Sequence, residues 1–580
     1  MIADLVATNG RIATLDENMP SATSFAVKDG KFVAVGDDGA TAPLVGDDTK
    51  RIDLKGRRVV PGLNDSHTHL IRGGLSYNME LRWEGVPSLA DAMRLLRAQA
   101  ARTPAPQWVR VVGGWTEFQF AERRLPTLDE LNDAAPDTPV FVLHLYRQAF
   151  LNRAALHAVG YTKDSPNPPG GEIQRDAQGN PTGLLIARPN AGILYATLAK
   201  GPKLSPDDQL NSTRLFTREM NRFGLTSVVD AGGGYQYFPD DYRIFETLAN
   251  NGELTIRTAY NLFTQHPGGE LSDFQNWIAA TRPYTGTDFY RHNGAGEMLT
   301  FSAADFEDFA EPRPHLSQSL EEELYRVVRA LVENRWPFRL HATYDESISR
   351  FLDVYERVDR EISFEGVRWF FDHCETISDL NLERVAALGG GIAVQDRMAF
   401  QGEYFVGRYG AEDARHSPPV RKMLAMGIPV GAGTDATRVS SYNPWISLYW
   451  LVTGKTVGGM PLYGEDNRLD RTTALRLYTR GSAWFSAEEQ RKGAISPGMF
   501  ADVAVLTDDF FGVPNDGIKT IESVLTLVDG KVVYAAQDFA DLAPTAPPAS
   551  PSWSPHNTQH GYPGGVAAQR RAGSPDCCSS

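Results

Sequence analysis

The chain of 580 residues is poor in cysteine, has no excess of positive charge and contains no long apolar run. Its three cysteines, Cys374 and the adjacent Cys577 and Cys578, are too few for a disulfide framework, which indicates a reducing compartment. A formal net charge of −15 repels polyphosphate, so we expect no nucleic-acid partner. No stretch approaches the roughly 18 uninterrupted apolar residues of a membrane span, and the first residues lack the features of a secretory signal. These absences predict a soluble, cytoplasmic protein with no membrane partner.

The two ends of the chain share one pattern of apolar and polar residues. Residues 1–60 and 490–540 contain short alternating apolar runs separated by turn signals, among them the hairpin signal Asp529–Gly530. We therefore expect both ends to pair into one small β-sandwich. Residues 541–580 are rich in Pro, Ala, Ser and Gly without periodic apolar positions, so we expect a disordered tail in which the Cys577–Cys578 pair has no role in the fold.

Residues 61–489 alternate buried strand-like runs with helical patterns, as parallel βα units with outer helices do. The run Phe338–Thr343 is typical of a buried strand, and Ser319 followed by Glu322 predicts the start of a helix. This order predicts an α/β fold of the (β/α)₈ barrel type. Residues 76–200 fit the alternation poorly, so we expect an inserted subdomain over the barrel mouth.

Five polar residues stand at the ends of predicted strands. His67 and His69 are two positions apart on extended backbone, so their side chains point to the same side. His341, His373 and Asp435 each end a predicted buried strand, and the carboxyl ends of barrel strands meet at one mouth. Any one of these residues by itself is at least as well explained by packing or capping. Together they predict a metal site.

Imidazole and carboxylate groups are the ligands of zinc and its divalent neighbours, and a catalytic ion keeps one position open for water. Such an ion lowers the pKa of that water toward neutrality. Asp435 is the candidate general base that takes the water's proton. The nitrogen-rich ligand set favours zinc, with manganese, iron and nickel as alternatives.

Several motifs resemble the amidohydrolase superfamily. They are Pro61–His69, His341 in His-Ala-Thr-Tyr-Asp, His373 in Asp-His-Cys-Glu, Asp435 in Gly-Thr-Asp-Ala, and Gly493–Val503. Pro168–Asp176 together with Pro181–Leu185 is similar to the amidohydrolase-3 branch that includes N-substituted formamide deformylases. The resemblance spans about residues 3 to 535.

The resemblance implies a distorted TIM (β/α)₈ barrel with a small β-sandwich from both termini. It implies hydrolysis of an N-substituted amide, formamide or carbamate by a metal-activated hydroxide. His67 and His69 would bind a first metal, His341 and His373 a second metal or the substrate, and Asp435 would be both base and ligand. A mononuclear deaminase or cyclic-amide hydrolase is the alternative reading. A third hypothesis is an inactive scaffold protein, and the presence of all five candidate metal ligands argues against it.

One departure from the family pattern concerns a lysine. Binuclear members usually supply a bridging carboxylated lysine from the fourth strand, but the equivalent run, Asp288–Gly294, contains none. Without a bridging anion two divalent ions would repel each other strongly, so a single zinc ion is favoured. His373 would then be free to hydrogen-bond the water or the substrate. His292 and Glu297 lie close to the missing position and are the candidate replacement ligands.

Residues outside the metal set are candidates for substrate contact. Trp115 and Tyr290 belong to a group of aromatic residues in predicted loops, which favours an aromatic small-molecule substrate, although packing explains them equally well. His292 is a further candidate. Arg397 or Arg438 would clamp a carboxylate or carbonyl, with a structural salt bridge as the alternative. Family habit suggests a homodimer.

Overall fold

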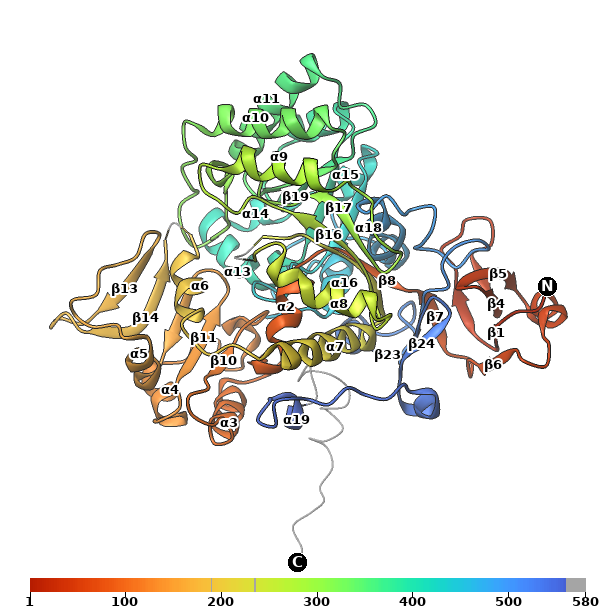
Figure 1. Ribbon diagram of the computed structural model, residues 1–580, viewed down its shortest axis with the longest axis horizontal. Helices are drawn as coiled ribbons and strands as arrows, with labels where there is room; N and C mark the ends of the chain where they lie inside the picture. Colours follow the sequence, from red (N-terminus) through yellow and green to blue (C-terminus); the bar gives the residue numbers. More distant parts are fainter. Residues whose placement is uncertain (189, 234–235, 560–580) are drawn as a thin grey trace, which may run out of the picture.

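The computed structural model describes residues 1–188, 190–233 and 236–559. At its centre eight parallel strands follow one another in chain order (Figure 1). They are β8 (Leu63–Thr68), β15 (Leu225–Asp230), β16 (Arg257–Leu262), β17 (Tyr290–Ala295), β18 (Phe338–Ala342), β19 (Trp369–His373), β20 (Gly391–Gln395) and β21 (Val430–Gly433). Just beyond β21, the Asp435 N–H donates to the carbonyl of His67 on β8 at 2.8 Å and brings the last strand against the first. The expected distorted (β/α)₈ barrel is confirmed.

Helices cover the outside of this barrel. The main ones are α7 (Pro206–Arg222), α8 (Arg243–Asn250), α9 (Glu270–Ala280), α10 (Leu320–Glu333), α11 (Asp345–Glu361), α12 (Asp379–Ala387), α13 (Arg397–Tyr409), α15 (Val420–Ala425) and α16 (Pro444–Thr453). In α10, Leu324, Val327 and Leu331 recur at helical spacing and are buried, which explains why this segment packs as a helix. The helix predicted after Ser319 is therefore present, although the Ser319 hydroxyl contacts the hydroxyl of Ser317 and does not cap the helix.

The two chain ends form two sheets beside the barrel. The first sheet contains β5 (Lys31–Gly36), β4 (Ser24–Lys28), β1 (Leu5–Thr8) and β6 (Lys50–Asp53). The second contains β24 (Lys531–Ala535), β23 (Ser523–Val528), β22 (Val503–Leu506), β7 (Arg58–Pro61), β2 (Arg11–Ala13) and β3 (Ser21–Ala22). Strand β22 pairs with β7 so that Val505 lies opposite Val59, and Phe25 of the first sheet shares a core with Leu525 of the second. The expected sandwich of both termini is confirmed.

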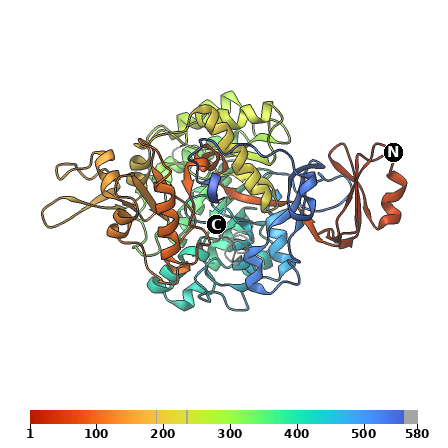
Figure 2. The ribbon, with the colours of Figure 1, turned by 90° about the horizontal axis from the view of Figure 1, so that it is seen from below.

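A third sheet lies in the segment between β8 and β15. Its strands are β13 (Gly171–Arg175), β14 (Pro181–Ala187), β12 (Gln148–Leu151), β11 (Val140–His144), β10 (Val109–Val111) and β9 (Glu80–Leu81), accompanied by α3 (Leu89–Ala100), α4 (Leu128–Ala134), α5 (Arg153–Val159) and α6 (Gly192–Leu198). We call this region, residues 76–200, the insertion. Figures 1 and 2 show it on the side of the barrel away from the terminal sandwich.

The start of the tail differs from the expectation. Residues 541–559, expected to be disordered, are placed against the body of the protein. The buried ring of His556 stacks on Tyr77 with ring centres 4.0 Å apart, and Asn78 Nδ2 donates to the Ser550 carbonyl at 2.8 Å. A buried aromatic contact of this kind anchors a segment whose composition indicates no core of its own. Cys577 and Cys578 lie outside the described residues.

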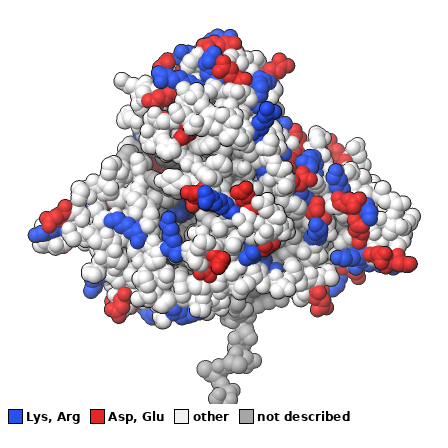
Figure 3. Space-filling view, viewed as in Figure 1, with Lys and Arg blue, Asp and Glu red and all other residues white. Residues whose placement is uncertain are grey.

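Within the described ranges, no helix combines the length and apolar character needed to cross a membrane. Figure 3 shows Lys and Arg interspersed with Asp and Glu over the visible face. A protein that binds nucleic acid through its backbone phosphates presents a continuous basic patch, and this face carries none.

Candidate metal centre

The five residues expected to bind metal converge at one end of the barrel. His67 lies on β8, His341 on β18 and His373 at the end of β19, while His69 and Asp435 follow their strands by one and two residues. Potential ligand atoms of His67, His373 and Asp435 all lie within 4.8 Å of one another. Parallel strands bring these side chains together because their carboxyl ends share one mouth.

The backbone is strained where two of these strands end. His373 and Asp435 have φ values of 78° and 53°, in the left-handed region that non-glycine residues seldom occupy. Such a conformation costs roughly 1–3 kcal/mol per residue and is concentrated at functional sites. Here it turns both side chains into the barrel mouth as the chain leaves the sheet.

Glu297, two residues after the end of β17, stands between the two histidine pairs. Its Oε1 is 3.6 Å from His69 Nε2, and its Oε2 is 3.5 Å from His67 Nε2. The same Oε2 is 3.5 Å from His341 Nδ1 and 3.7 Å from His373 Nε2. A carboxylate therefore lies between the two histidine pairs, in a chain whose sequence showed no bridging lysine.

His292, the other candidate replacement, lies away from this cluster. Its ring nitrogens approach the carbonyl oxygens of Arg282 and Gly294 at 3.0 and 3.1 Å, and its ring packs against Trp336. The sequence could not separate it from Glu297, because the two lie only five residues apart and the register of β17 decides which of them reaches the mouth.

The cluster fits a divalent ion. Two ligand atoms that each lie about 2.1 Å from one tetrahedral ion are about 3.4 Å apart. Asp435 Oδ1 is 3.1 Å from His69 Nε2 and 3.4 Å from His67 Nε2, so the spacing is compatible with a shared ion. His67 Nε2 is buried and forms no hydrogen bond within the described part of the chain. A buried nitrogen without a partner is costly, and a bound cation would satisfy it.

A buried pair holds the His67 ring in place. Asp372 Oδ1 is 3.0 Å from His67 Nδ1, and Arg339 binds Asp372 through Nε at 2.8 Å and through Nη2. Burial disfavours the imidazolium form of His67, but the charges of Asp372 and Glu297 outweigh burial and raise its pKa. A metal ion bound at Nε2 would displace the proton there. A carboxylate on one ring nitrogen orients the other toward a metal. Sequence reasoning missed both partners, although Asp372 directly precedes His373 and Arg339 shares a strand face with His341.

The carboxylate of Asp435 is ionised in this environment. Burial raises its pKa, but the nearby rings of His67 and His69 outweigh burial and hold the pKa well below the usual range of an aspartate. A charged, hydrogen-bonded carboxylate at a metal site can serve as ligand or as proton acceptor.

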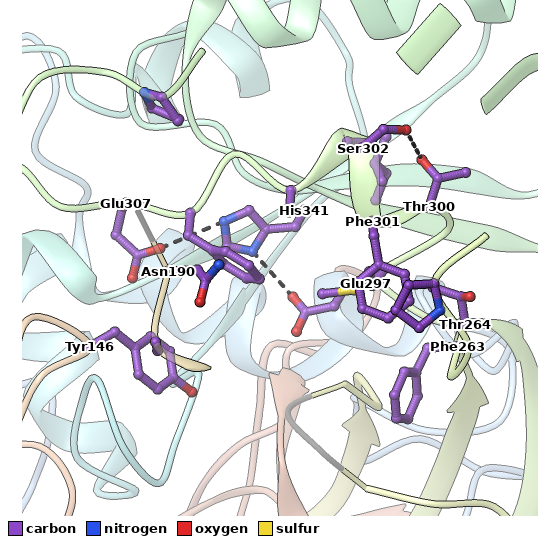
Figure 4. Close-up of a pocket in the computed structure, with 18 of the residues that line it drawn as sticks. Tyr146, Asn190, Phe263, Thr264, Glu297, Thr300, Phe301, Ser302, Glu307 and His341 are labelled. Atoms are coloured by element: carbon purple, nitrogen blue, oxygen red, sulfur yellow. Dashed lines mark hydrogen bonds and ion pairs between the residues drawn. The ribbon is translucent and has the colours of Figure 1, made fainter. Parts of the chain in front are cut away.

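A cavity of about 680 Å³ opens onto the cluster. His69, Glu297, His341 and Asp435 line it together with residues of the insertion and of loops after β16 and β17 (Figure 4). Its aromatic lining is formed by Tyr146, Tyr195, Tyr237, Phe263, Phe301 and Phe306. The cavity therefore offers a largely apolar chamber beside the polar cluster, as small-molecule sites do.

The aromatic residues expected at the substrate do not line this cavity. Trp115 lies in the core of the insertion against Trp83, and its Nε1 donates to the Leu143 carbonyl at 2.9 Å. Tyr290 begins β17, at the end of that strand away from the mouth, and stacks on Tyr260 with ring centres 4.6 Å apart. Packing, the alternative reading, accounts for both.

The two candidate arginines have different environments. Arg397 forms buried ion pairs with Glu307 and Glu375, so its charge is balanced within the protein. Arg438 lies 4.7 Å from the ring centre of Tyr195, a residue of the cavity wall, and has no ion pair with any described residue.

Comparison with known proteins agrees with this architecture. The chain is 26% identical over 565 residues to N-substituted formamide deformylase from Arthrobacter pascens, covering 92% of this chain and 98% of that one. A metal-dependent hydrolase from Pyrococcus furiosus superposes with a TM-score of 0.62 at 22% identity, covering 87% of this chain and 99% of that chain. Atrazine chlorohydrolase from Arthrobacter aurescens TC1, complexed with zinc, superposes with a TM-score of 0.53 at 16% identity, over 92% and 95% of the two chains. These two structures support the fold.

The family model for amidohydrolase-3 proteins, described as "Amidohydrolase family", matches residues 50–534. The matched range contains the whole barrel, the insertion and all residues of the cluster. The chain therefore belongs to the amidohydrolase family and is a metal-dependent hydrolase.

Proposed function

We propose that this protein hydrolyses the C–N bond of an amide-like small molecule, such as an N-substituted amide, formamide or carbamate. The observation that carries the proposal is the placement of the ionised Asp435 carboxylate 3.1 Å from His69 and 3.4 Å from His67, on the wall of the cavity. The resemblance over nearly the full length of a formamide deformylase supports the substrate class. A zinc ion held by the cluster would supply a water of lowered pKa and would polarise the substrate carbonyl.

Asp435 and His373 have different roles in the proposed reaction. Asp435 accepts the proton of the attacking water and delivers it to the leaving nitrogen, which requires the ionised carboxylate that its depressed pKa provides. His373 Nδ1 is buried without a hydrogen bond among the described residues, so it is available to hydrogen-bond the carbonyl oxygen. The apolar lining excludes bulk water and so strengthens both interactions.

We further propose that the centre holds two zinc ions with Glu297 between them. The expectation of a single ion depended on the lack of a bridging anion, and the position of Glu297 removes that premise. His67 and His69 would serve one ion, and His341 and His373 the other. The cytoplasmic location and the homodimer stay predictions.

The first experiment measures metal content and products on protein purified without added metal. About two ions per chain, lost in a His67→Ala/His69→Ala variant, would support the bridged centre. About one ion would restore the mononuclear reading. Release of an acid and an amine from an N-substituted formamide would support amide hydrolysis, whereas release of ammonia would identify a deaminase. No metal, and no uptake of added zinc or manganese, would overturn the proposal.

A further inference from the structure

One wall of the cavity is built from positive charge and phenol groups. Arg72 lies on α2 (Leu70–Ser76), three residues after His69, and lines the cavity. It donates through Nη1 to the hydroxyl of Tyr195 at 3.0 Å and through Nη2 to that of Tyr146 at 3.2 Å. The two hydroxyls are 2.8 Å apart, and Arg438 lies over the ring of Tyr195. Arg72, Tyr146 and Tyr195 line the cavity and Arg438 lies behind Tyr195; we call these four residues the arginine–tyrosine wall.

Both arginines of this wall lack a counter-ion. Arg72 is 6% exposed and Arg438 8%, and neither forms an ion pair with any residue in the described part of the chain. The Nε atom of each is buried without a hydrogen bond. Burial, reinforced by the charge of Arg72, lowers the pKa of Arg438. Asp435 and Glu80 attract Arg72 and Arg438 only from beyond ion-pair distance. Two buried guanidinium groups close together without a paired carboxylate are unfavourable unless an anion joins them.

The other charges that line the cavity are already balanced. Glu307 pairs with Arg397, and Asp308 lies 4.0 Å from Arg147. Glu297 and Asp435 belong to the metal cluster, where they would serve as ligands of bound cations. The wall is therefore the place in the cavity lining where a positively charged side chain has no ion-pair partner among the described residues.

We propose that the arginine–tyrosine wall binds a carboxylate of the substrate. This proposal rests on the proposed amide hydrolysis and narrows it to amides that carry a carboxylate on one side of the scissile bond. The remaining guanidinium N–H groups of Arg72 and the Tyr146 hydroxyl supply several donors to one anion, which suits the planar, two-oxygen geometry of a carboxylate. Arg438 adds charge from behind Tyr195.

The far side of the cavity is suited to an apolar substituent. In Figure 4, Tyr146 and Phe263 appear at opposite sides of the view, with Glu297 and His341 between them. Phe301 and Phe263 line the side away from the wall. A substrate that spans the cavity would place its carboxylate on the wall, its amide at the metal cluster and its apolar group against these rings.

The test compares a carboxylate with its neutral amide by calorimetry on the zinc-loaded protein, using 3-phenylpropionate and 3-phenylpropanamide. We expect the wild type to bind the carboxylate at least tenfold more tightly. Arg72→Met and Arg438→Met should each remove most of that preference. Arg147→Met is the matched control, because it removes a guanidinium that is balanced by Asp308, and it should retain the preference.

Two results would overturn the proposal. One is equal binding of the two probes by the wild type. The other is a preference that survives in both Arg72→Met and Arg438→Met, which would place the carboxylate on the metal cluster. If Arg72→Met does not fold, Arg72→Lys replaces it; this variant keeps the charge but loses the fork, and a reduced preference would support the proposal. Binding needs no turnover, so these outcomes are independent of whether the amide-hydrolase proposal holds.

Discussion

The barrel and the insertion contribute to the same cavity in different ways. The barrel supplies groups from strand ends, such as His341 on β18 and Asp435 after β21, held by a continuous parallel sheet. The insertion supplies Tyr146 from the turn between β11 and β12, and Tyr195 from the short helix α6. Rigid strand ends suit groups that must keep their geometry during a reaction, whereas loops can vary in sequence without disturbing the sheet. We therefore expect the strand ends of the barrel to carry the chemistry, and the insertion together with the barrel loops to set substrate choice.

The largest effect is expected at the proposed base. Asp435→Asn keeps the shape of the side chain but cannot accept the proton of the water, so kcat should fall by about 10³-fold or more while the fold and most of the metal remain. Turnover, metal content and thermal unfolding are measured together. The exposed Asp508→Asn is the control. Near-normal turnover in Asp435→Asn would remove this residue from the mechanism.

The next effect tests the carboxylate between the two histidine pairs. Glu297→Gln removes its charge, so bound zinc should fall from about two ions to about one per chain, and turnover by roughly 100-fold. His292→Gln is the matched control, since that ring contacts backbone carbonyls away from the cluster. Metal loss in His292→Gln, with full metal content in Glu297→Gln, would show that His292 and not Glu297 is the metal ligand.

A smaller effect is expected from the partner of His67. Asp372→Asn weakens the hydrogen bond that orients the imidazole, and such changes lower metal affinity roughly 10- to 100-fold. Competition with a chelator measures the affinity. The same variant leaves Arg339 without its buried counter-ion, so it should also unfold at a lower temperature. Unchanged zinc affinity would show that Asp372 acts on stability alone.

The smallest effect on catalysis is expected inside the insertion. Trp115→Phe loses the hydrogen bond to the Leu143 carbonyl and should cost about 1–2 kcal/mol of stability. Because Trp115 is buried away from the cavity, kcat and KM should change by no more than about twofold. A tenfold rise in KM without a change in unfolding temperature would place Trp115 at the substrate. It would contradict the assignment of Trp115 to the core of the insertion.

The sequence predicted the barrel well because its strands are short buried runs that alternate with amphipathic helices. Phe338–Thr343 was expected to contain a strand, and β18 covers Phe338–Ala342 of that run. The terminal sandwich was also predictable, since residues 1–60 and 490–540 share alternating runs. The anchored segment 541–559 was not, because the Tyr77 ring that His556 covers lies more than 470 residues earlier in the chain.

For the candidate site, the sequence by itself determined which strand ends carry imidazole and carboxylate groups. The reason is that a side chain at the carboxyl end of a barrel strand reaches the mouth regardless of the conformation of the loops. Only the tertiary structure decided that Glu297 stands between the histidine pairs and His292 does not, that Trp115 and Tyr290 pack in cores, and that Arg72 meets Tyr146 and Tyr195. Those outcomes depend on strand register and on loops that bring distant residues together, and no local pattern encodes either.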